Sequence, residues 1–170
     1  MAANPATALA TVVADEFRRR IIEEYIPRIS RCVALLSPEE IWHRPGPESN
    51  AIGNLLLHLE GNVRQWVHCG IAEQTDIRNR DLEFSATAAS IDTHPDELVE
   101  RLRETAEQAA TIVDDLGPHD LLEQRCFQER YDETCLGAVL HVMEHFSGHA
   151  GQIYAFTKQL KAVDLKFYDL

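Results

Sequence analysis

The sequence predicts an all-α protein, built as a four-helix bundle with short extra helices in its connections. Two observations favour this fold class: apolar residues recur at three- and four-residue steps over four long stretches, and strand-like alternation is scarce. The chain has 170 residues, of which 45% are hydrophobic and 26% are charged, and it contains no repeat or low-complexity tract. We therefore expect residues 1–170 to form a single domain.

The first predicted helix begins at Asn4-Pro5, because Asn is a good N-cap and Pro is tolerated at the first helical position. Its apolar stripe continues to Leu36, and Pro27 should kink or interrupt it. The segment Ser37-Pro38-Glu39-Glu40 predicts a short capped helix, and Arg44-Pro45-Gly46-Pro47 predicts the loop that follows it.

Three more long helices follow. The second runs from about position 49 or 50 to about Gly70, before a less regular segment around residues 72–92. Thr93-x-x-Asp96 offers a capping box for the third helix, which should end at Gly117-Pro118. Residues 118–133 indicate a short helical turn and then an extended connection, and the fourth helix should run from near Thr134 to about Lys161.

The fourth helix is apolar on nearly every side. Such a helix is normally buried all round, either within its own bundle or against a second subunit. Gly148, Gly151 and Ala155 form a ridge of small residues, which would allow another helix to approach closely. Tight packing within the monomer and a dimer contact both explain this pattern, and we expect a homodimer.

Three histidines, His141, His145 and His149, follow one another at four-residue spacing within this helix. Random placement of the 8 histidines among 170 residues would give only about 0.02 such triplets. Residues four apart lie on the same helix face, so one of the two pairs could hold a metal ion. All three cannot share one ion, because His141 and His149 are separated by roughly 12 Å along the helix axis.

A third ligand can come from His58 in the second helix. On a helical wheel, uncharged polar residues share its face: Asn54, Asn62 and Gln65. The solvent face, about 120° away on the same wheel, carries Glu60, Arg64 and His68. A row of neutral polar groups between the core and the solvent is typical of a pocket wall, so His58 is a candidate ligand.

Composition excludes several other functions. The net charge of −12 opposes binding to nucleic acids or anionic membranes, because both depend on clustered Lys and Arg. No stretch contains the roughly 18 apolar residues that span a bilayer, and no secretory signal is evident, so we expect a cytoplasmic protein. The four cysteines form no metal-binding or disulfide pattern. The sequence also lacks a G-x-S-x-G elbow and a Gly-rich phosphate loop.

Two segments resemble the DinB/YfiT-like metalloenzymes, four-helix bundles in which three histidines hold a metal ion. These segments are NAIGNLLLHLEGNVRQW at residues 50–66 and HVMEHFSGHAGQI at residues 141–153, and both are typical of a DinB-like subgroup of unknown function. The resemblance implies that His58, His145 and His149 are the metal ligands. Many relatives carry Arg after the last of these histidines, whereas this chain has Ala150.

The remaining polar and aromatic residues near these histidines are expected to line the pocket or to orient the ligands. They are Asn54, Asn62, Trp66, His141 and Gln152. Trp66 is expected first of all in the core. The spacing identifies no residue as a general base.

A site with three neutral ligands leaves open positions on a divalent ion, as in catalytic rather than structural sites. Imidazole suits zinc, nickel, copper and iron alike, and we expect zinc or nickel. Because some relatives use a low-molecular-weight thiol, the leading hypothesis is a thiol-dependent transferase or a hydrolase that acts on a small molecule. The alternatives are a bundle that binds a metal or ligand without catalysis, such as a stress-associated dimer, and histidines with a purely structural role.

Overall fold

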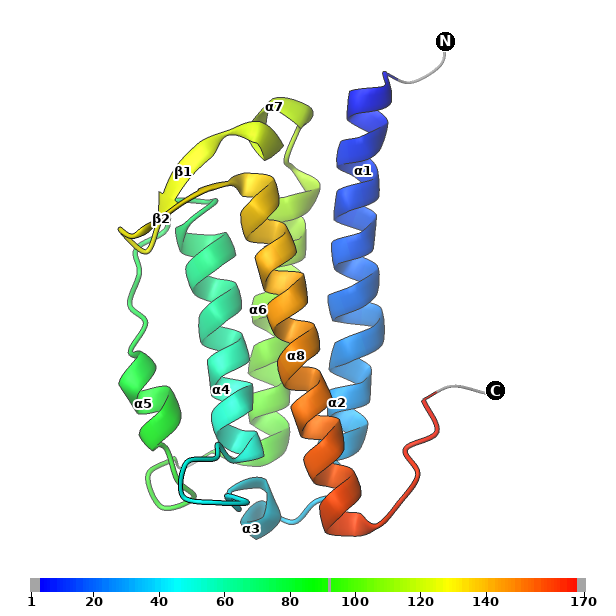
Figure 1. The fold of residues 1–170 in the computed structure, drawn as a ribbon, viewed down its shortest axis with the longest axis vertical. Coiled ribbons are helices and arrows are strands. Elements are labelled where there is room, and N and C mark those ends of the chain that lie inside the picture. Colours follow the sequence, from blue (N-terminus) through cyan, green and yellow to red (C-terminus); the bar gives the residue numbers. More distant parts are fainter. Residues whose placement is uncertain (1–3, 92, 168–170) are drawn as a thin grey trace.

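Four helical rods pack side by side in the computed structural model, which describes residues 4–91 and 93–167 (Figure 1). The first rod joins α1 (Pro5–Arg18), η1 (Arg19–Tyr25) and α2 (Ile26–Val33); the second joins α4 (Ile52–Val63) and η2 (Arg64–Cys69); the third is α6 (Pro95–Asp114) and the fourth is α8 (Cys135–Lys161). Each rod contacts two others, so the four close into a ring around a shared core. The predicted all-α four-helix bundle is confirmed.

The connections carry the short extra elements. They are α3 (Pro38–Ile41), α5 (Arg80–Ser85), α7 (Pro118–Leu122), β1 (Gln124–Phe127) and β2 (Tyr131–Thr134). The second and third rods run in the same direction, and residues 70–91 return along the bundle between them (Figure 1). This return places α5 against α4, beside the lower half of the second rod in Figure 1.

Pro27 interrupts the α-helical pattern of the first rod without breaking the rod. It lies in the first turn of α2, directly after the π-helical η1, and the Ile26 N–H bonds to the carbonyl of Ile21. Because Pro has no N–H, a regular α-helical bond is missing at this point. The predicted interruption is therefore a change of helix type.

The caps of the last two rods differ in how well the sequence predicts them. The third rod begins one residue later than the Thr93 capping box predicts: His94 is the N-cap, and its Nδ1 accepts from the Asp96 N–H at 3.3 Å. Pro95 explains the shift, since its fixed φ suits the first helical position. The predicted start of the fourth rod is confirmed, because the Thr134 hydroxyl accepts from the Gly137 N–H at 2.9 Å.

The single chain leaves one side of the fourth rod exposed, so its own bundle does not bury this helix on all sides. Leu140 is 50% exposed, and nothing lies within 4 Å of a Cβ built at Gly148 or Gly151. The opposite side of α8 is buried, with Phe146 and Ile153 fully covered. Small residues look apolar in sequence but expose little apolar area, so a helix face made of them tolerates water. The homodimer stays a prediction.

The extended connection predicted after the third rod is an antiparallel hairpin, β1–β2. Gln124 pairs with Thr134 and Phe127 with Tyr131, and the turn between them includes Gln128 in the left-handed region, at φ 55°. Phe127 is buried against the second rod, where its ring lies 5.1 Å from that of Trp66. The hairpin therefore packs against the end of the second rod and against α8.

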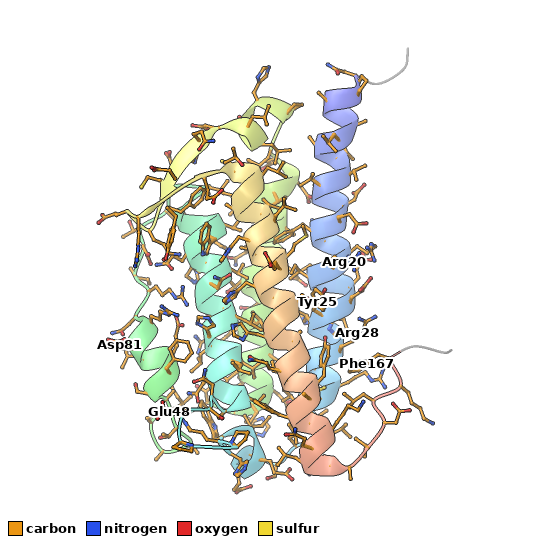
Figure 2. The ribbon with its side chains drawn as sticks, in the orientation of Figure 1. Arg20, Tyr25, Arg28, Glu48, Asp81 and Phe167 are labelled. Carbon is orange, nitrogen blue, oxygen red and sulfur yellow. The ribbon has the colours of Figure 1, made fainter. Side chains whose placement is uncertain are left out.

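The segment after α8 folds back onto the first rod. Phe167 lies beside Arg28, whose Cζ is 5.7 Å from the ring centroid, and the Arg31 guanidinium donates to the carbonyl of Leu165 at 2.9 Å (Figure 2).

Within the described residues, no helix combines the length and the apolar character needed to cross a bilayer.

Candidate metal centre

Three histidines from two adjacent rods converge between α4 and α8. His58 comes from α4, and His145 and His149 come from successive turns of α8. One nitrogen from each ring can be chosen such that all three lie within 4.8 Å of one another, and the Nε2 atoms of His58 and His145 are 3.0 Å apart. His58 is buried and the other two are half-buried. The three rings are close enough together to hold a metal ion.

Two of these rings are oriented by hydrogen bonds on their outer nitrogen. The Nδ1–H of His58 donates to Glu83 Oε2 at 2.9 Å, and the Nδ1–H of His149 donates to Gln152 Oε1 at 2.7 Å. An acceptor at Nδ1 places the proton there and leaves the Nε2 lone pair bare. This is how metal-binding histidines are usually held.

Glu83 is itself fixed by a buried arginine. Arg78 donates from Nε to Oε1 at 2.6 Å and from Nη2 to Oε2 at 2.8 Å, and its Nη1 donates to Gln65 Oε1 at 2.7 Å. Burial alone would raise the pKa of Glu83, but the hydrogen bonds from Arg78 and His58 outweigh it and hold the pKa below its ordinary value. The carboxylate therefore stays ionised. Its negative charge favours the His58 proton on Nδ1, although Arg78 Nη2 also lies 3.0 Å from that nitrogen.

The helix that carries Glu83 is pinned against α4. The Asn54 amide donates to the carbonyls of Glu83 and Ala86 at 2.9 Å each, and its oxygen accepts from the Ala51 N–H at 3.0 Å. A Cβ at Gly61 would lie 2.2 Å from Glu83 Oε1, so only glycine allows this approach. Asn54 thus acts through the backbone around Glu83 and does not line the pocket.

The half-buried imidazoles stay neutral. Burial lowers the pKa of His145 to about 3, and the neighbouring His149 and His58 lower it further in the same direction. Burial also lowers the pKa of His149, although its bond to Gln152 opposes the change. Neutral rings offer the lone pair that a metal ion needs, and the His145 ring does so well below neutral pH.

The donor set fits a divalent ion. Two bare lone pairs 3.0 Å apart repel each other, so the His58 and His145 nitrogens need a proton or a cation between them. Two nitrogens bound to zinc at ~2.1 Å, with an angle of ~90–110° between them, lie ~3.0–3.4 Å apart. The observed separation therefore suits two ligands of one ion as well as it suits a hydrogen bond.

A pocket of about 320 Å³ opens beside His58 and His145. His141 forms part of its wall, with its ring stacked 4.0 Å from that of Trp66 and its Nε2 lying 3.4 Å from the Asn62 amide nitrogen. The other residues that line it are Arg78, Arg80, Gln128, Tyr131 and Glu133. A larger hollow of about 720 Å³ near Cys69 and Arg125 includes none of the three histidines, so the smaller pocket is the one relevant to the metal.

The π-helical η2 explains why Trp66 faces this pocket. Each π-helical residue rotates the chain by less than the ~100° of an α-helix. Side chains after Val63 therefore point in directions that a regular α-helical wheel does not predict. Val67 takes the fully buried core position, and Trp66 rotates toward His141. The same change of direction corrects the predicted place of His68, which is 1% exposed and donates from Nε2 to the carbonyl of Thr105 at 3.0 Å.

Sequence reasoning missed Glu83 and Arg78. Both lie in the segment around residues 72–92, which shows no regular apolar spacing. Their roles come from contacts with α4 that no local pattern encodes. Their opposite charges were the only sequence signal that could have indicated an ion pair. Arg78 and Glu83 lie five positions apart in the segment that connects the second and third helices.

Comparisons with known proteins identify a family and a similar fold. The model of a family described as "Protein of unknown function (DUF1572)" matches residues 11–169. A crystal structure of a DinB-like protein from Bacillus cereus is similar with a TM-score of 0.61 and 12% sequence identity, covering 81% of this chain and 87% of that one. At this identity the likeness shows the fold alone. No curated protein matches the sequence.

Proposed function

This chain belongs to the DUF1572 family of proteins of unknown function, and we propose that it binds a divalent metal ion through His58, His145 and His149. One observation carries the proposal: three histidine nitrogens from two rods lie within 4.8 Å of one another. Glu83 and Gln152 hold two of the rings with their Nε2 atoms turned inward. The resemblance to the DinB/YfiT-like metalloenzymes supports the same ligand set.

The site supports an enzyme that acts on a small molecule, either a thiol-dependent transferase or a hydrolase. Three protein ligands leave coordination positions open to a substrate. A zinc or nickel ion would supply Lewis-acid chemistry and lower the pKa of a water or thiol that binds to it. The protein supplies the three ligands, a pocket wall that includes Trp66 and His141, and the Asn62 amide for hydrogen bonding.

The competing function is a bundle that holds a metal without turnover. The pocket favours the enzyme, because a storage site needs no cavity of about 320 Å³ beside its ion. This cavity borders two of the proposed ligands and has both aromatic and charged residues in its wall. Those are the features that a small organic substrate requires.

Metal content tests the first part of the proposal. Protein purified without a His tag is incubated with zinc or nickel, desalted and analysed for metal. We expect about one equivalent in the wild type and under about a tenth in His145→Ala, because two ligands hold a divalent ion weakly. His119→Ala, which removes an exposed histidine from α7, should bind as the wild type does. A wild-type protein that takes up no metal would contradict the proposal.

Turnover tests the second part. Panels of electrophiles with small thiols, and of small esters and amides, are compared between the metal-loaded wild type and His145→Ala. We expect activity that requires the ion and is lost in the variant. A protein with one equivalent of metal and no turnover on any panel would support the storage function, and unchanged turnover in the variant would remove the metal from the mechanism.

A further inference from the structure

The two arginines that line the pocket differ in how their charge is used. The guanidinium of Arg78 already has partners within the protein. Its side chain is 7% exposed, and its nitrogens donate hydrogen bonds to Glu83 and Gln65. Arg80 is exposed, and its Cζ lies 5.5 Å from the ring centroid of Phe84. Across the part of the chain that the structure describes, no carboxylate forms an ion pair with Arg80.

Glu133 presents the opposite charge to the same pocket. Its cross-strand neighbour is Arg125, the natural partner in an antiparallel hairpin. Arg125 instead pairs with Glu123 at 2.8 Å and Glu73 at 3.6 Å, and it also donates to the carbonyl of Gly70. Among residues 4–91 and 93–167, no ion pair involves Glu133.

These two charges share a pocket without neutralising each other. Arg80 comes from the start of α5 and Glu133 from β2, and the two side chains are not within ion-pair distance. Opposite charges across a cavity attract complementary groups of a ligand, and they do so more strongly once the ligand displaces water. His58 and His145 border the same cavity, so a ligand bound by both charges also lies beside the metal ligands.

We propose that the pocket binds a small zwitterion, with its anionic group at Arg80, its cationic group at Glu133 and a donor atom directed at the metal. Amino acids and dipeptides that carry a thiol or an imidazole belong to this chemical class. The rings of Trp66 and Tyr131 give the apolar part of such a ligand a flat surface. This inference rests on the proposed metal site and adds the charge pattern of the ligand.

Five thiols isolate each charge while keeping the same donor atom. Cysteinylglycine and cysteine carry both charges, N-acetylcysteine carries only the anion, cysteamine only the cation, and 2-mercaptoethanol neither. Each is titrated into the cobalt-loaded full chain, and binding is followed by the thiolate-to-cobalt charge-transfer absorption. Every Kd is corrected for the fraction of thiolate at the pH used. We expect each missing charge to weaken binding about fivefold to tenfold.

Two variants assign the charges to residues. Arg80→Gln should weaken N-acetylcysteine and the two zwitterions about tenfold and leave cysteamine unchanged. Glu133→Gln should weaken cysteamine and the zwitterions and leave N-acetylcysteine unchanged. Both residues are exposed, so the fold should tolerate either change. Arg20→Gln, on the exposed face of the first rod, is the matched control and should change no Kd (Figure 2).

Three outcomes would overturn the inference. Equal affinity for all five thiols, with cobalt bound, would reject a charged ligand and leave the metal site intact. Dependence on only one of the two residues would reject a zwitterion in favour of a simple anion or cation. A chain that takes up no cobalt would reject the metal site and the zwitterion together.

Discussion

His58 and His149 face the same point from two adjacent rods, but the protein holds them in different ways. His58 is 4% exposed and donates to a buried carboxylate that is itself paired with Arg78. His149 is half-buried and donates to the amide of an exposed residue, Gln152, on its own helix. One ligand is therefore fixed by a charged network that ties three segments together, and the other is adjustable. The network around His58 should govern both metal affinity and stability, whereas Gln152 should affect affinity alone.

The largest effect is expected from Glu83→Ala. This change leaves the Arg78 guanidinium buried without its partner, which typically costs about 3–5 kcal/mol of unfolding free energy. It also frees the His58 ring, and loss of such a partner usually lowers metal affinity by about 10–100-fold. Urea unfolding and zinc competition titrations measure the two effects.

Glu16→Ala serves as the control, because Glu16 forms only exposed ion pairs with Arg19 and Arg20. Exposed pairs contribute little, so this variant should unfold and bind metal nearly as the wild type does. If Glu83→Ala matched the control in both measurements, the charged network would have no role in holding His58.

Gly61→Ala tests the same network without removing a charge. The new Cβ would lie 2.2 Å from Glu83 Oε1 and 2.8 Å from Arg78 Nε, so the ion pair or α5 must shift. Overpacking of this kind costs about 1–3 kcal/mol, and the shift should weaken zinc binding. Gly148→Ala is the matched helical change in open space, and there alanine should add about 0.5–1 kcal/mol of stability. Equal changes in stability and zinc affinity for the two variants would contradict a tight fit between Gly61 and Glu83.

Acid should destabilise the metal-free protein. The pKa of His145 is about 3 in the folded chain and about 6.5 when unfolded, so the unfolded state binds more protons between these values. The stability that is present above about pH 6.5 is therefore lost as the pH falls toward 3, at up to about 1.4 kcal/mol per pH unit for this group. Urea unfolding at several pH values measures the slope. His145→Asn should flatten it, and an unchanged slope would mean that His145 is protonated in the folded state.

The smallest effect is expected from Gln152→Ala. The exposed amide orients His149 but joins no buried network, so its loss should weaken zinc binding by less than about tenfold. The urea midpoint should stay within the range of ordinary surface changes, about 0.5 kcal/mol. A loss of affinity as large as that of Glu83→Ala would show that the two histidines are held equally tightly.

The sequence was sufficient to predict features that depend on local spacing. The four rods follow from apolar periodicity, and the start of the last one follows from the Thr134 cap. The four-residue spacing of His145 and His149 fixed their common helix face, and the polar stripe on the second helix drew attention to His58. These inferences need only the geometry of one helix.

Features that depend on contacts between segments could not be read in this way. Glu83 reaches His58 only because residues 70–83 return along α4, which no pattern within that segment predicts. The π-helical turn of η2 depends on tertiary packing, and it moves Trp66 toward His141 and buries His68. A regular helical wheel therefore fails just beyond Val63, at the edge of the pocket.

The proposed chemistry requires one divalent ion held jointly by His58, His145 and His149. Anomalous diffraction from crystals of zinc-loaded protein, recorded on both sides of the zinc absorption edge, locates such an ion. We expect one strong peak about 2.0–2.1 Å from a nitrogen of each of the three rings. A peak at the cysteines or on the surface, with the three imidazoles bonded only to one another and to protein groups, would contradict this coordination.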